Sequence, residues 1–327
     1  MKFPPIYQLT PEINQLLIDL EALKRVVGLL NPAPQVIEYL KRKSILKSSV
    51  FSARIEGNPL MPEDIREINM EKPITRNAQE VSNLLSAYTA LESYRHKPTD
   101  VDTVRALHRY VMAGLEPTPG QLRMVDSAVY NRAGLAVYIA PAHWKVRQLL
   151  SAMCEFINSA ADPRPAVAAV THIWFEKIHP FEDGNGRVGR LLSALILKSG
   201  GYDLGGLVPF EEYLDNNRQA YYDALTSDSQ DVTVFISFFI RSITAQSHDS
   251  LEKLKNPPPD KYLNLLPRRA EILAIIEDHR QVSFDFISRR FRQIPQRTIH
   301  YDITRLIRDG LVRKRGSTRG ALYEPDS

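Results

Sequence analysis

The sequence has little of what secreted, disulfide-linked or membrane proteins need. It contains one cysteine, Cys154, among 327 residues, so no disulfide can form within the chain and a reducing compartment is favoured. No apolar run approaches the roughly 20 residues that span a bilayer. The N-terminus, MKFPPIYQLTPEINQ, lacks the apolar core of a secretion signal. We therefore expect a cytoplasmic protein with no membrane association.

The net charge is only +4, but it is unevenly distributed. Residues 262–327 hold 13 Lys and Arg against 8 Asp and Glu, which leaves 29 basic and 30 acidic residues for the rest of the chain. The whole basic excess therefore lies in the C-terminal segment. Solvated helix faces and contact with a polyanion such as DNA are both consistent with it.

Apolar residues recur at helical spacing through most of the chain up to about residue 255. One apolar face runs from Leu16 to Val27, and a second helix, at about 33–57, is stopped by Gly57 and Asn58-Pro59. The body of the protein is therefore expected to be mainly α. Further helices are predicted at about 77–95, 101–113, 145–159, 165–178, 187–199, 211–226 and 231–254.

One segment of the body departs from helical spacing. Leu122 to Ile139 alternates between apolar and polar residues, and the turn-forming run Asn131-Arg132-Ala133-Gly134 divides it. The pattern predicts a short β-hairpin whose second strand is Ala136–Ile139, ended by Pro141.

The clearest boundary in the chain is the linker Asn256-Pro257-Pro258-Pro259-Asp260, because three consecutive prolines cannot continue a helix. After it, residues 261–327 predict a small winged helix-turn-helix domain. Its expected elements are helices at 268–279, 284–291 and 296–309, and strands at 311–315 and 321–323. We divide the remainder into N-terminal helices, 1–100, and a core, 101–255.

The run from His179 to Arg190 concentrates chemical groups in twelve residues. An amphipathic helix delivers His179 to its end, and Pro180 prevents that helix from continuing. Asp183-Gly184-Asn185-Gly186 can expose successive backbone N–H groups at the start of the next helix, which favours anion binding. Arg187 and Arg190 lie one turn apart and suit phosphate oxygens, while Asp183 is a ligand suited to Mg²⁺. His179 is placed to accept a proton.

This run resembles the signature of the Fic family, His-Pro-Phe-x-Asp-Gly-Asn-Gly-Arg-x-x-Arg, at every specified position. The resemblance covers roughly residues 100–240 and implies the helical Fic fold with a short hairpin flap. Fic proteins mostly transfer AMP from ATP to a Ser, Thr or Tyr hydroxyl of a target protein and release pyrophosphate. The resemblance therefore implies a protein adenylyltransferase.

The resemblance also assigns roles to the motif residues. His179 would deprotonate the target hydroxyl, and Asp183 would hold Mg²⁺ against the α- and β-phosphates. The Gly184-Asn185-Gly186 backbone and the Asn185 side chain would cradle those phosphates. Arg187 would stabilise charge in the transition state, and Arg190 would bind the γ-phosphate. ATP is the implied substrate, and the implied partner is a protein with an acceptor hydroxyl or the chain itself.

Two further segments resemble family features. Ser52-Ala53-Arg54-Ile55-Glu56-Gly57 resembles the inhibitory motif Ser/Thr-x-x-x-Glu-Gly/Asn, with Ser52 and Glu56 on one helix face. In relatives this Glu pairs with the second motif arginine, here Arg190, and blocks the γ-phosphate position. Relatives also align targets along a flap strand by main-chain pairing, which here corresponds to Val137, Tyr138 and Ile139.

Adenosine recognition is less specific in this sequence. Relatives use the helices after the motif, where Tyr213, Asn216 and Asn217 share a face here. We take Asn216 as the candidate ATP contact, and core packing is an equal alternative for Tyr221. His108 and His172 lie among apolar residues without metal-ligand spacing and are expected to belong to the core.

The sequence of the C-terminal domain does not identify its binding partner. Residues 292–319 carry eight Lys and Arg against two acids, which suits DNA, but many winged helices bind protein instead. A nucleotide-sensing DNA-binding regulator and an enzyme that removes AMP are therefore alternatives to the adenylyltransferase. A homodimer also stays open.

Overall fold

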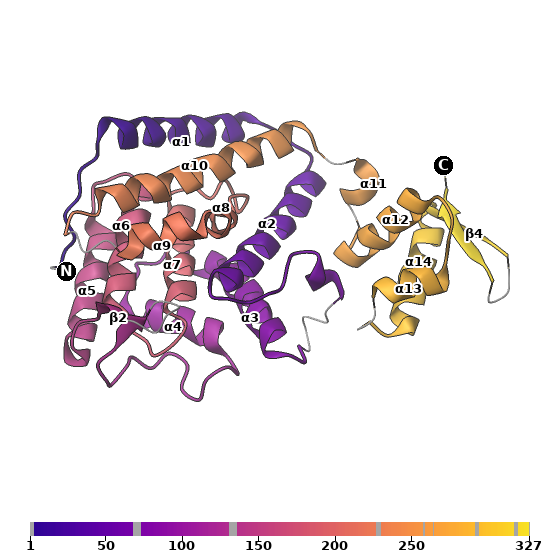
Figure 1. The fold of residues 1–327 in the computed structure, drawn as a ribbon. Helices are drawn as coiled ribbons and strands as arrows, with labels where there is room; N and C mark the ends of the chain where they lie inside the picture. The colour runs from indigo at the N-terminus through magenta and orange to yellow at the C-terminus, as the bar shows by residue number, and fades with distance from the viewer. Residues whose placement is uncertain are drawn as a thin grey trace.

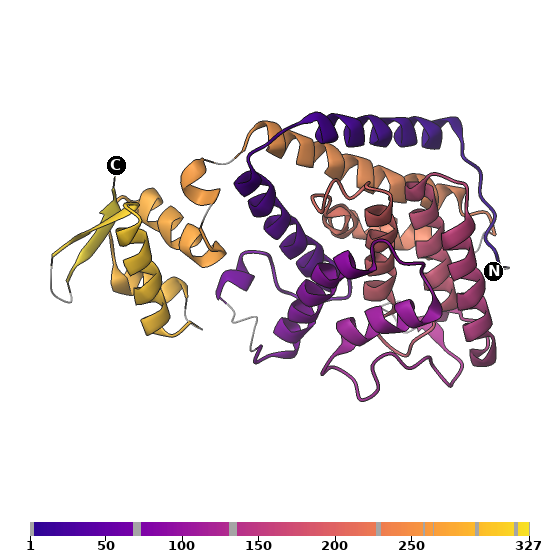
Figure 2. The same cartoon turned by 180° about the vertical axis from the view of Figure 1, so that it is seen from behind.

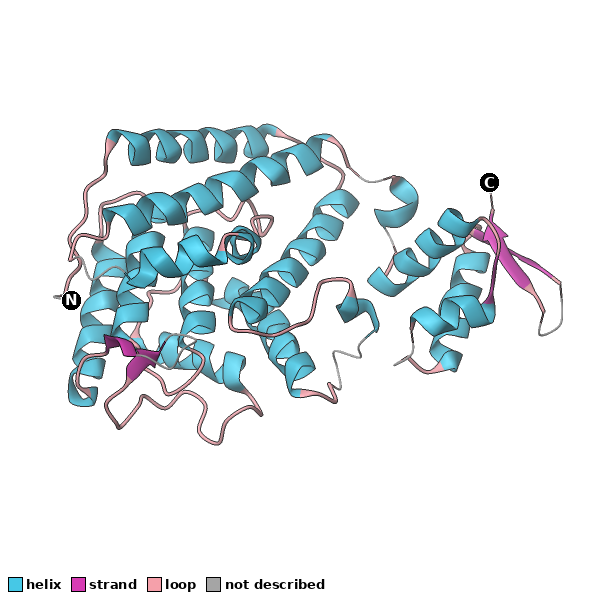
Figure 3. Ribbon diagram, viewed as in Figure 1, coloured by secondary structure: helices cyan, strands magenta, loops and turns pink. Residues whose placement is uncertain are grey.

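The fold is that of a computed structural model, which describes residues 3–67, 73–130, 136–226, 230–257, 259–263, 265–291, 294–316 and 320–326. The chain forms a helical body and a smaller C-terminal unit at one end of it (Figures 1 and 3). The helices of the body are α1 (Pro11–Leu29), α2 (Pro34–Ile55), α3 (Arg76–Ala90), α4 (Val101–Met112), α5 (Val146–Ser159), α6 (Arg164–Ile178), α7 (Asn185–Ser199), α8 (Phe210–Asn216), α9 (Arg218–Thr226) and α10 (Thr233–Lys255).

Short elements complete the body. Three 3₁₀ turns are η1 (Asp64–Glu67), η2 (Leu91–Tyr94) and η3 (His143–Lys145). The strands β1 (Ala128–Tyr130) and β2 (Ala136–Ile139) pair antiparallel as the expected hairpin, with Val129 opposite Tyr138. The first strand is shorter than the alternating pattern from Leu122 implied, and the expected turn 131–134 lies outside the described residues.

Side-chain caps start several of the helices where the sequence places a suitable residue. Thr10 accepts a hydrogen bond from the Ile13 N–H at the start of α1, and Asp100 accepts one from the Thr103 N–H at the start of α4. Gly57, with φ +99°, follows the end of α2 in the left-handed region that a side chain would disfavour. These local signals fix where α2 stops, and therefore where Glu56 lies.

The centre of the body is the packed pair α6 and α7. Almost every residue of α6 is buried, because α5, α7 and α10 surround it. On the outside, α1 runs alongside α10, as both views show (Figures 1 and 2). The helix α2 packs against α3 and α8, so it passes close to the start of α7.

One predicted helix is wrong in its extent. The segment 211–226 forms two helices, α8 and α9, because Asn217 leaves the helical region with φ −116° and ψ 37°. Its side-chain Nδ2 donates to the carbonyl of Tyr213 at 2.9 Å, an alternative to continuing the helix that asparagine often takes.

The C-terminal unit combines helices with a small sheet. Its helices are α11 (Asp260–Leu263), α12 (Pro267–His279), α13 (Phe284–Arg290) and α14 (Gln296–Arg308). The sheet has the order β3 (Val282–Ser283), β5 (Leu322–Pro325), β4 (Val312–Arg315), all antiparallel. The two-residue strand β3 was not predicted, because so short a run has no recognisable alternation.

The buried hydrophobic residues of the body extend to Leu263, and those of the C-terminal unit begin at Leu265, although Tyr262 already packs against the C-terminal core. Leu263 packs in the core of the body, and its carbonyl accepts a hydrogen bond from Arg42 of α2 at 3.2 Å. Within the described residues, the chain has no helix with the length and apolar character to cross a bilayer. Pro258 of the predicted linker and Arg319, at the end of the basic segment 292–319, lie outside those residues.

Candidate active site

The end of α6 sets the position of His179. This residue follows the last helical residue in the left-handed conformation, with φ 48° and ψ 61°, and its N–H still donates to the Phe175 carbonyl at 3.0 Å. Burial lowers the pKa of His179, although the backbone carbonyl of Glu176 opposes this shift. The imidazole is therefore neutral near pH 7 and able to accept a proton.

The side chain of Asn185 closes the loop between α6 and α7. Its Oδ1 accepts from the Phe181 N–H at 2.9 Å, and its Nδ2 donates to the Phe181 carbonyl at 2.8 Å. Only 3% of the residue is exposed. The amide thus holds the loop, and the contact with phosphates that the family resemblance assigned to it stays a prediction.

Gly184 and His108 support the other side of the loop. Gly184 has φ +78°, and a Cβ there would lie 2.8 Å from Sδ of Met112. The ring of His108 stacks on Phe181 with centroids 3.8 Å apart. Its Nδ1 accepts from the Gly120 N–H at 2.7 Å, and its Nε2 lies 3.0 Å from the carbonyl oxygen of the residue before Gly184. Burial lowers the pKa of His108 to about 4, so it is the neutral core residue that its surroundings predicted.

Arg187 lies between two carboxylates. Its guanidinium is 3.0 Å from Oδ1 of Asp183 and 3.7 Å from Oε1 of Glu80 on α3. Arg76, also on α3, lies 3.8 Å from Oδ2 of Asp183. The sequence offered no motif that marks Arg76 or Glu80, because α3 meets α7 only through the tertiary fold. The two carboxylates therefore hold the Arg187 guanidinium between α3 and the loop that precedes α7.

Glu56 lies over the start of α7 and contacts Arg190. Its Oε1 is 2.8 Å from the Arg190 guanidinium, which also donates to Oγ of Ser52 at 3.0 Å and to the Ser52 carbonyl at 2.9 Å. A Cβ on Gly186 would lie 2.2 Å from that same Oε1. The Glu56 carboxylate therefore occupies the helix N-terminus, where an anion is favoured.

Arg190 is fully buried, with 0% exposure. Burial alone would lower its pKa, but the pairing with Glu56 more than offsets this and leaves the pKa of Arg190 raised. The guanidinium therefore stays charged in a poorly hydrated site, where pairing with a carboxylate or a phosphate is strong.

Further contacts hold α2 in this place. Ser48 donates to Glu211 of α8 at 2.7 Å, and Arg54 donates to Asp215 of α8 at 3.0 Å. Glu211 is buried, and burial raises its pKa. The helix that carries Glu56 is thus attached to the helix that ends at Asn216.

Asn216, the candidate ATP contact, is the exposed last residue of α8. Tyr221 instead belongs to the core: its hydroxyl is 2.8 Å from Nε2 of His172, whose Nδ1 lies 3.1 Å from Oγ of Ser193. Burial lowers the pKa of His172 to about 3, so this histidine is also a neutral core residue, as predicted. Tyr222 donates to the carbonyl of the last α2 residue at 2.9 Å.

Arg123 is a site residue that the sequence analysis missed. This buried guanidinium donates to the carbonyls of Val125 and His179, both at 2.8 Å, and also to that of Pro141. It therefore ties the turn after α6 to both ends of the hairpin. A single arginine in an otherwise apolar stretch was the available signal, and its partners are backbone atoms that no motif displays.

The hairpin lies beside this turn. The Tyr138 hydroxyl donates to the Lys177 carbonyl at 2.9 Å, and the Lys177 ammonium lies 4.5 Å from the Tyr138 ring centroid. Ile139 is 78% exposed. Val137 lies at the irregularity between the pairs Val129–Tyr138 and Tyr130–Ala136, and its side chain lies outside the described atoms.

The described residues contain no cluster of three or more His, Cys, Asp or Glu side chains that could hold a metal ion by itself. Asp183 offers one carboxylate whose side chain is 53% exposed. Magnesium in nucleotide sites is usually held by one or two protein carboxylates together with phosphate oxygens and water. Asp183 fits that pattern only when a phosphorylated ligand shares the ion.

Comparisons with known proteins point to one family. Residues 98–197 match the model of the Fic/DOC family. The protein adenylyltransferase fic-1 of Caenorhabditis briggsae is 27% identical over 281 residues, which cover 73% of this chain and 54% of that protein. The protein adenylyltransferase Fic of Drosophila willistoni is 23% identical and covers 68% of this chain. The chain spans about half the length of these curated relatives.

Solved structures share the fold. A Fic family protein from Desulfovibrio desulfuricans G20 superimposes with a TM-score of 0.70 and 22% identity, covering 99% of this chain and 98% of that one. Residues 134–508 of Fic-1 from Caenorhabditis elegans give a TM-score of 0.63 at 21% identity, covering 75% and 73%. The chain therefore contains a Fic domain, residues 98–197, within a mainly helical Fic fold.

Proposed function

We propose that this protein is a self-inhibited protein adenylyltransferase that moves AMP from ATP to a Ser, Thr or Tyr hydroxyl of a target protein or of itself. The observation that carries the proposal is the position of Glu56 over a complete Fic motif, 2.8 Å from Arg190 and at the N-terminus of α7. The names of the relatives, which are protein adenylyltransferases, support the same reaction.

In the proposed reaction, His179 takes the proton of the attacking hydroxyl. The hydroxyl oxygen forms a bond to the α-phosphorus, the bond from that phosphorus to the bridging oxygen breaks, and pyrophosphate leaves. A neutral imidazole is required for the first step, and the lowered pKa of His179 supplies it. No covalent intermediate with the protein is needed, and Cys154 is buried.

The phosphates would lie at the start of α7. Backbone N–H groups of Gly184, Asn185 and Gly186 would donate to the phosphates, and the helix dipole would favour their negative charge. Arg187, held by Asp183 and Glu80, would stabilise the charge that develops in the transition state. Arg190 would bind the γ-phosphate, and Asn216 at the end of α8 would contact the adenosine. Mg²⁺ shared between Asp183 and the phosphates would neutralise part of their charge when bound.

The target would pair with β2. Its strand edge, at Val137, Tyr138 and Ile139, can add a segment of the target by main-chain hydrogen bonds. The contact of Arg123 with both the His179 carbonyl and the Pro141 carbonyl supports this role, because it fixes the hairpin relative to the base. An acceptor hydroxyl in the paired segment would then face His179.

Inhibition follows from competition for Arg190. The Glu56 carboxylate and the γ-phosphate both need the same guanidinium, and both need the space above Gly186. ATP would therefore bind without its γ-phosphate in the productive position while Glu56 is in place. Release of Glu56, which is followed by Gly57, would restore that position.

Incubation with ATP labelled at the α-phosphate tests the proposal, alongside ATP labelled at the γ-phosphate. We expect label on protein from the first only, weakly with the native chain and strongly with Glu56→Gly. Transfer from γ-labelled ATP would mean phosphorylation, and no label with either variant would reject adenylylation. Release of AMP from prelabelled protein by the native chain would instead favour the AMP-removing alternative.

A second activity is proposed for the C-terminal unit, as a winged helix that contacts DNA. The observation that favours it is the exposed first part of α14, which carries Gln296, Arg297, His300 and Tyr301. The ring of His300 stacks on the ring of Phe284, with centroids 3.6 Å apart, which leaves Arg297 as the exposed cation of this surface. A recognition helix reads base edges with residues near its N-terminal end.

A further inference from the structure

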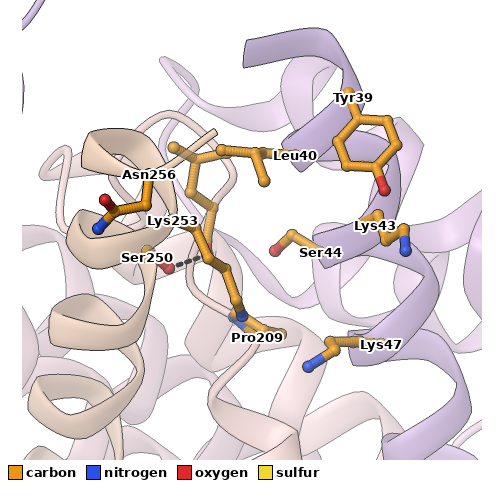
Figure 4. Close-up of a pocket in the computed structure, with 10 residues that line it drawn as sticks. Tyr39, Leu40, Lys43, Ser44, Lys47, Pro209, Ser250, Lys253 and Asn256 are labelled. Carbon is orange, nitrogen blue, oxygen red and sulfur yellow. Dashed lines mark hydrogen bonds between the residues drawn. The ribbon is translucent and has the colours of Figure 1, made fainter. Parts of the chain in front are cut away.

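A cavity of about 410 Å³ lies beside α2, away from the Fic motif (Figure 4). Its walls come from the first half of α2, from the segment that leads into α8, and from the end of α10. The volume is within the range of roughly 300–1,000 Å³ that small-molecule sites occupy. On α2 the lining ends at Lys47, about 13 Å along the helix from Glu56.

Lysines from two helices surround this cavity. Lys43 and Lys47 come from α2 and Lys253 from α10, and the lining residues include no acid. In the described part of the chain, Lys43 has no carboxylate partner, and its ammonium lies 5.2 Å from the Tyr39 ring centroid. The lining therefore carries a positive charge that the cavity itself does not neutralise.

The other two lysines remain available to a ligand. Lys253 pairs with Asp249 at i,i+4 on the exposed surface, and such pairs contribute little. Lys47 donates to both carboxylate oxygens of Glu212 at 2.7 Å, but an ammonium has three donors and can serve one further acceptor. A dianion in the cavity could therefore contact these lysines without displacing a fully buried pair.

The rest of the lining is apolar or weakly polar. Leu40, Leu207 and Pro209 face the cavity, and the Tyr39 ring adds an aromatic face. The Ser44 hydroxyl points into it from α2 (Figure 4). A lining that combines lysines with apolar side chains matches a ligand that carries both a negative charge and an apolar group.

We propose that this cavity binds a small phosphomonoester that carries an apolar group, and that the bound molecule ties α2 to α10. A dianionic phosphate suits a lining that carries three lysines and no acid, and one ring would fill the apolar part. A ligand stabilises the conformation that contains its binding site, which here is the conformation with α2 packed beside α10 and α8. Because α2 is continuous as far as Ile55, this also holds Glu56 over α7. The resulting decrease in AMP transfer rests on the proposed function, whereas binding does not.

Calorimetry at low salt, without ATP, tests the site with phenyl phosphate, inorganic phosphate and phenol. We expect phenyl phosphate to bind at least tenfold more tightly than inorganic phosphate, and phenol not to bind. The Lys43→Ala/Lys253→Ala variant should lose at least tenfold in affinity for phenyl phosphate. Lys41→Ala, on the same helix but outside the lining, should bind within about twofold of the native chain.

Hydrogen exchange gives the second readout. Phenyl phosphate should slow exchange of the α2 amides in the native chain and in Lys41→Ala, but not in the double variant. Equal affinities for the two phosphates, full binding by the double variant, or unchanged α2 exchange on binding would each overturn the proposal. Since no measurement requires ATP, failure here is distinct from failure of the proposed transfer.

Discussion

The motif has a buried side, at Arg190, and an exposed side, at Asp183, and the two differ in how their charges are paired. Arg190 is fully buried and bound by Ser52 and Glu56 of α2, whereas the Asp183 side chain is half exposed and faces Arg187. A carboxylate–guanidinium contact is far stronger in a buried site than in water. One residue from another helix can therefore block the buried side, while the exposed side stays free to exchange water for a ligand.

His179 is the proposed proton acceptor, and its replacement should have the largest effect on AMP transfer. His179→Ala removes the proton acceptor but leaves the phosphate contacts, so transfer should fall by about 10²–10⁴-fold with ATP affinity little changed. Labelling with α-labelled ATP and calorimetry with ATP, both in the Glu56→Gly background, measure the two quantities. Normal labelling by the alanine variant would disprove the base role.

The buried side should respond in opposite directions to two substitutions at one contact. Glu56→Gly frees Arg190 for the γ-phosphate, so transfer should rise, by about tenfold or more if the ion pair is worth 1.4 kcal/mol. Arg190→Ala breaks the same contact but also removes the phosphate ligand, so transfer should not rise. Initial rates of labelling compare the variants with the native chain.

A melting curve serves as the control for that pair. If Glu56 mainly supports the fold, both variants will be less stable and equally inactive, which contradicts self-inhibition. If it restrains the site, Glu56→Gly will gain activity with little change in Tm.

A buried acid behind Arg190 should make this side sensitive to pH. Oε1 of Glu176 is buried without a hydrogen-bond partner among the described residues, and burial raises the pKa of Glu176 to about 8. The unfolded chain loses this proton near pH 4.5 and the folded chain near 8, so its contribution to stability is fully present below 4.5 and is lost as pH rises toward 8.

Glu176→Gln should therefore change stability more at pH 8 than at pH 5. We expect its Tm relative to the native chain to rise by roughly 10 °C between these pH values, since 1 kcal/mol corresponds to about 2–4 °C in a large domain and the raised pKa changes stability by roughly 3–4 kcal/mol over this range. His172 and His108 titrate in both proteins, so their effects on Tm cancel in the comparison. A difference in Tm that does not depend on pH would show that Glu176 is ionised in the folded protein.

The smallest effect on transfer is expected from the C-terminal unit. A chain that ends after Leu263 keeps the residue that packs in the body and removes the separate core that begins at Leu265. Labelling should stay within about twofold of the full chain, because few contacts should cross such a boundary. Gel-shift assays with duplex DNA should lose any binding seen with the full chain, and retained binding would exclude the winged-helix role.

Much of the body could be predicted from the sequence because its signals are local. Helical spacing located α2, α6 and α7, and the Fic signature placed His179 and Arg190 on either side of one loop. The resemblance also named Glu56, and the structure places it beside Arg190. The break at Asn217 was missed, because a single residue that leaves the helical φ and ψ region changes no periodicity.

Contacts between distant segments were decided only by packing. Arg123 donates to backbone carbonyls, and Glu80 meets Arg187 across two helices, so neither could be recognised from spacing along the chain. Burial is likewise a property of the folded molecule: it raises the pKa of Glu176 and lowers that of His108 because the surroundings exclude water. Chemistry that depends on residue type and local spacing is written in the chain, whereas the strength of each charge depends on what the fold places around it.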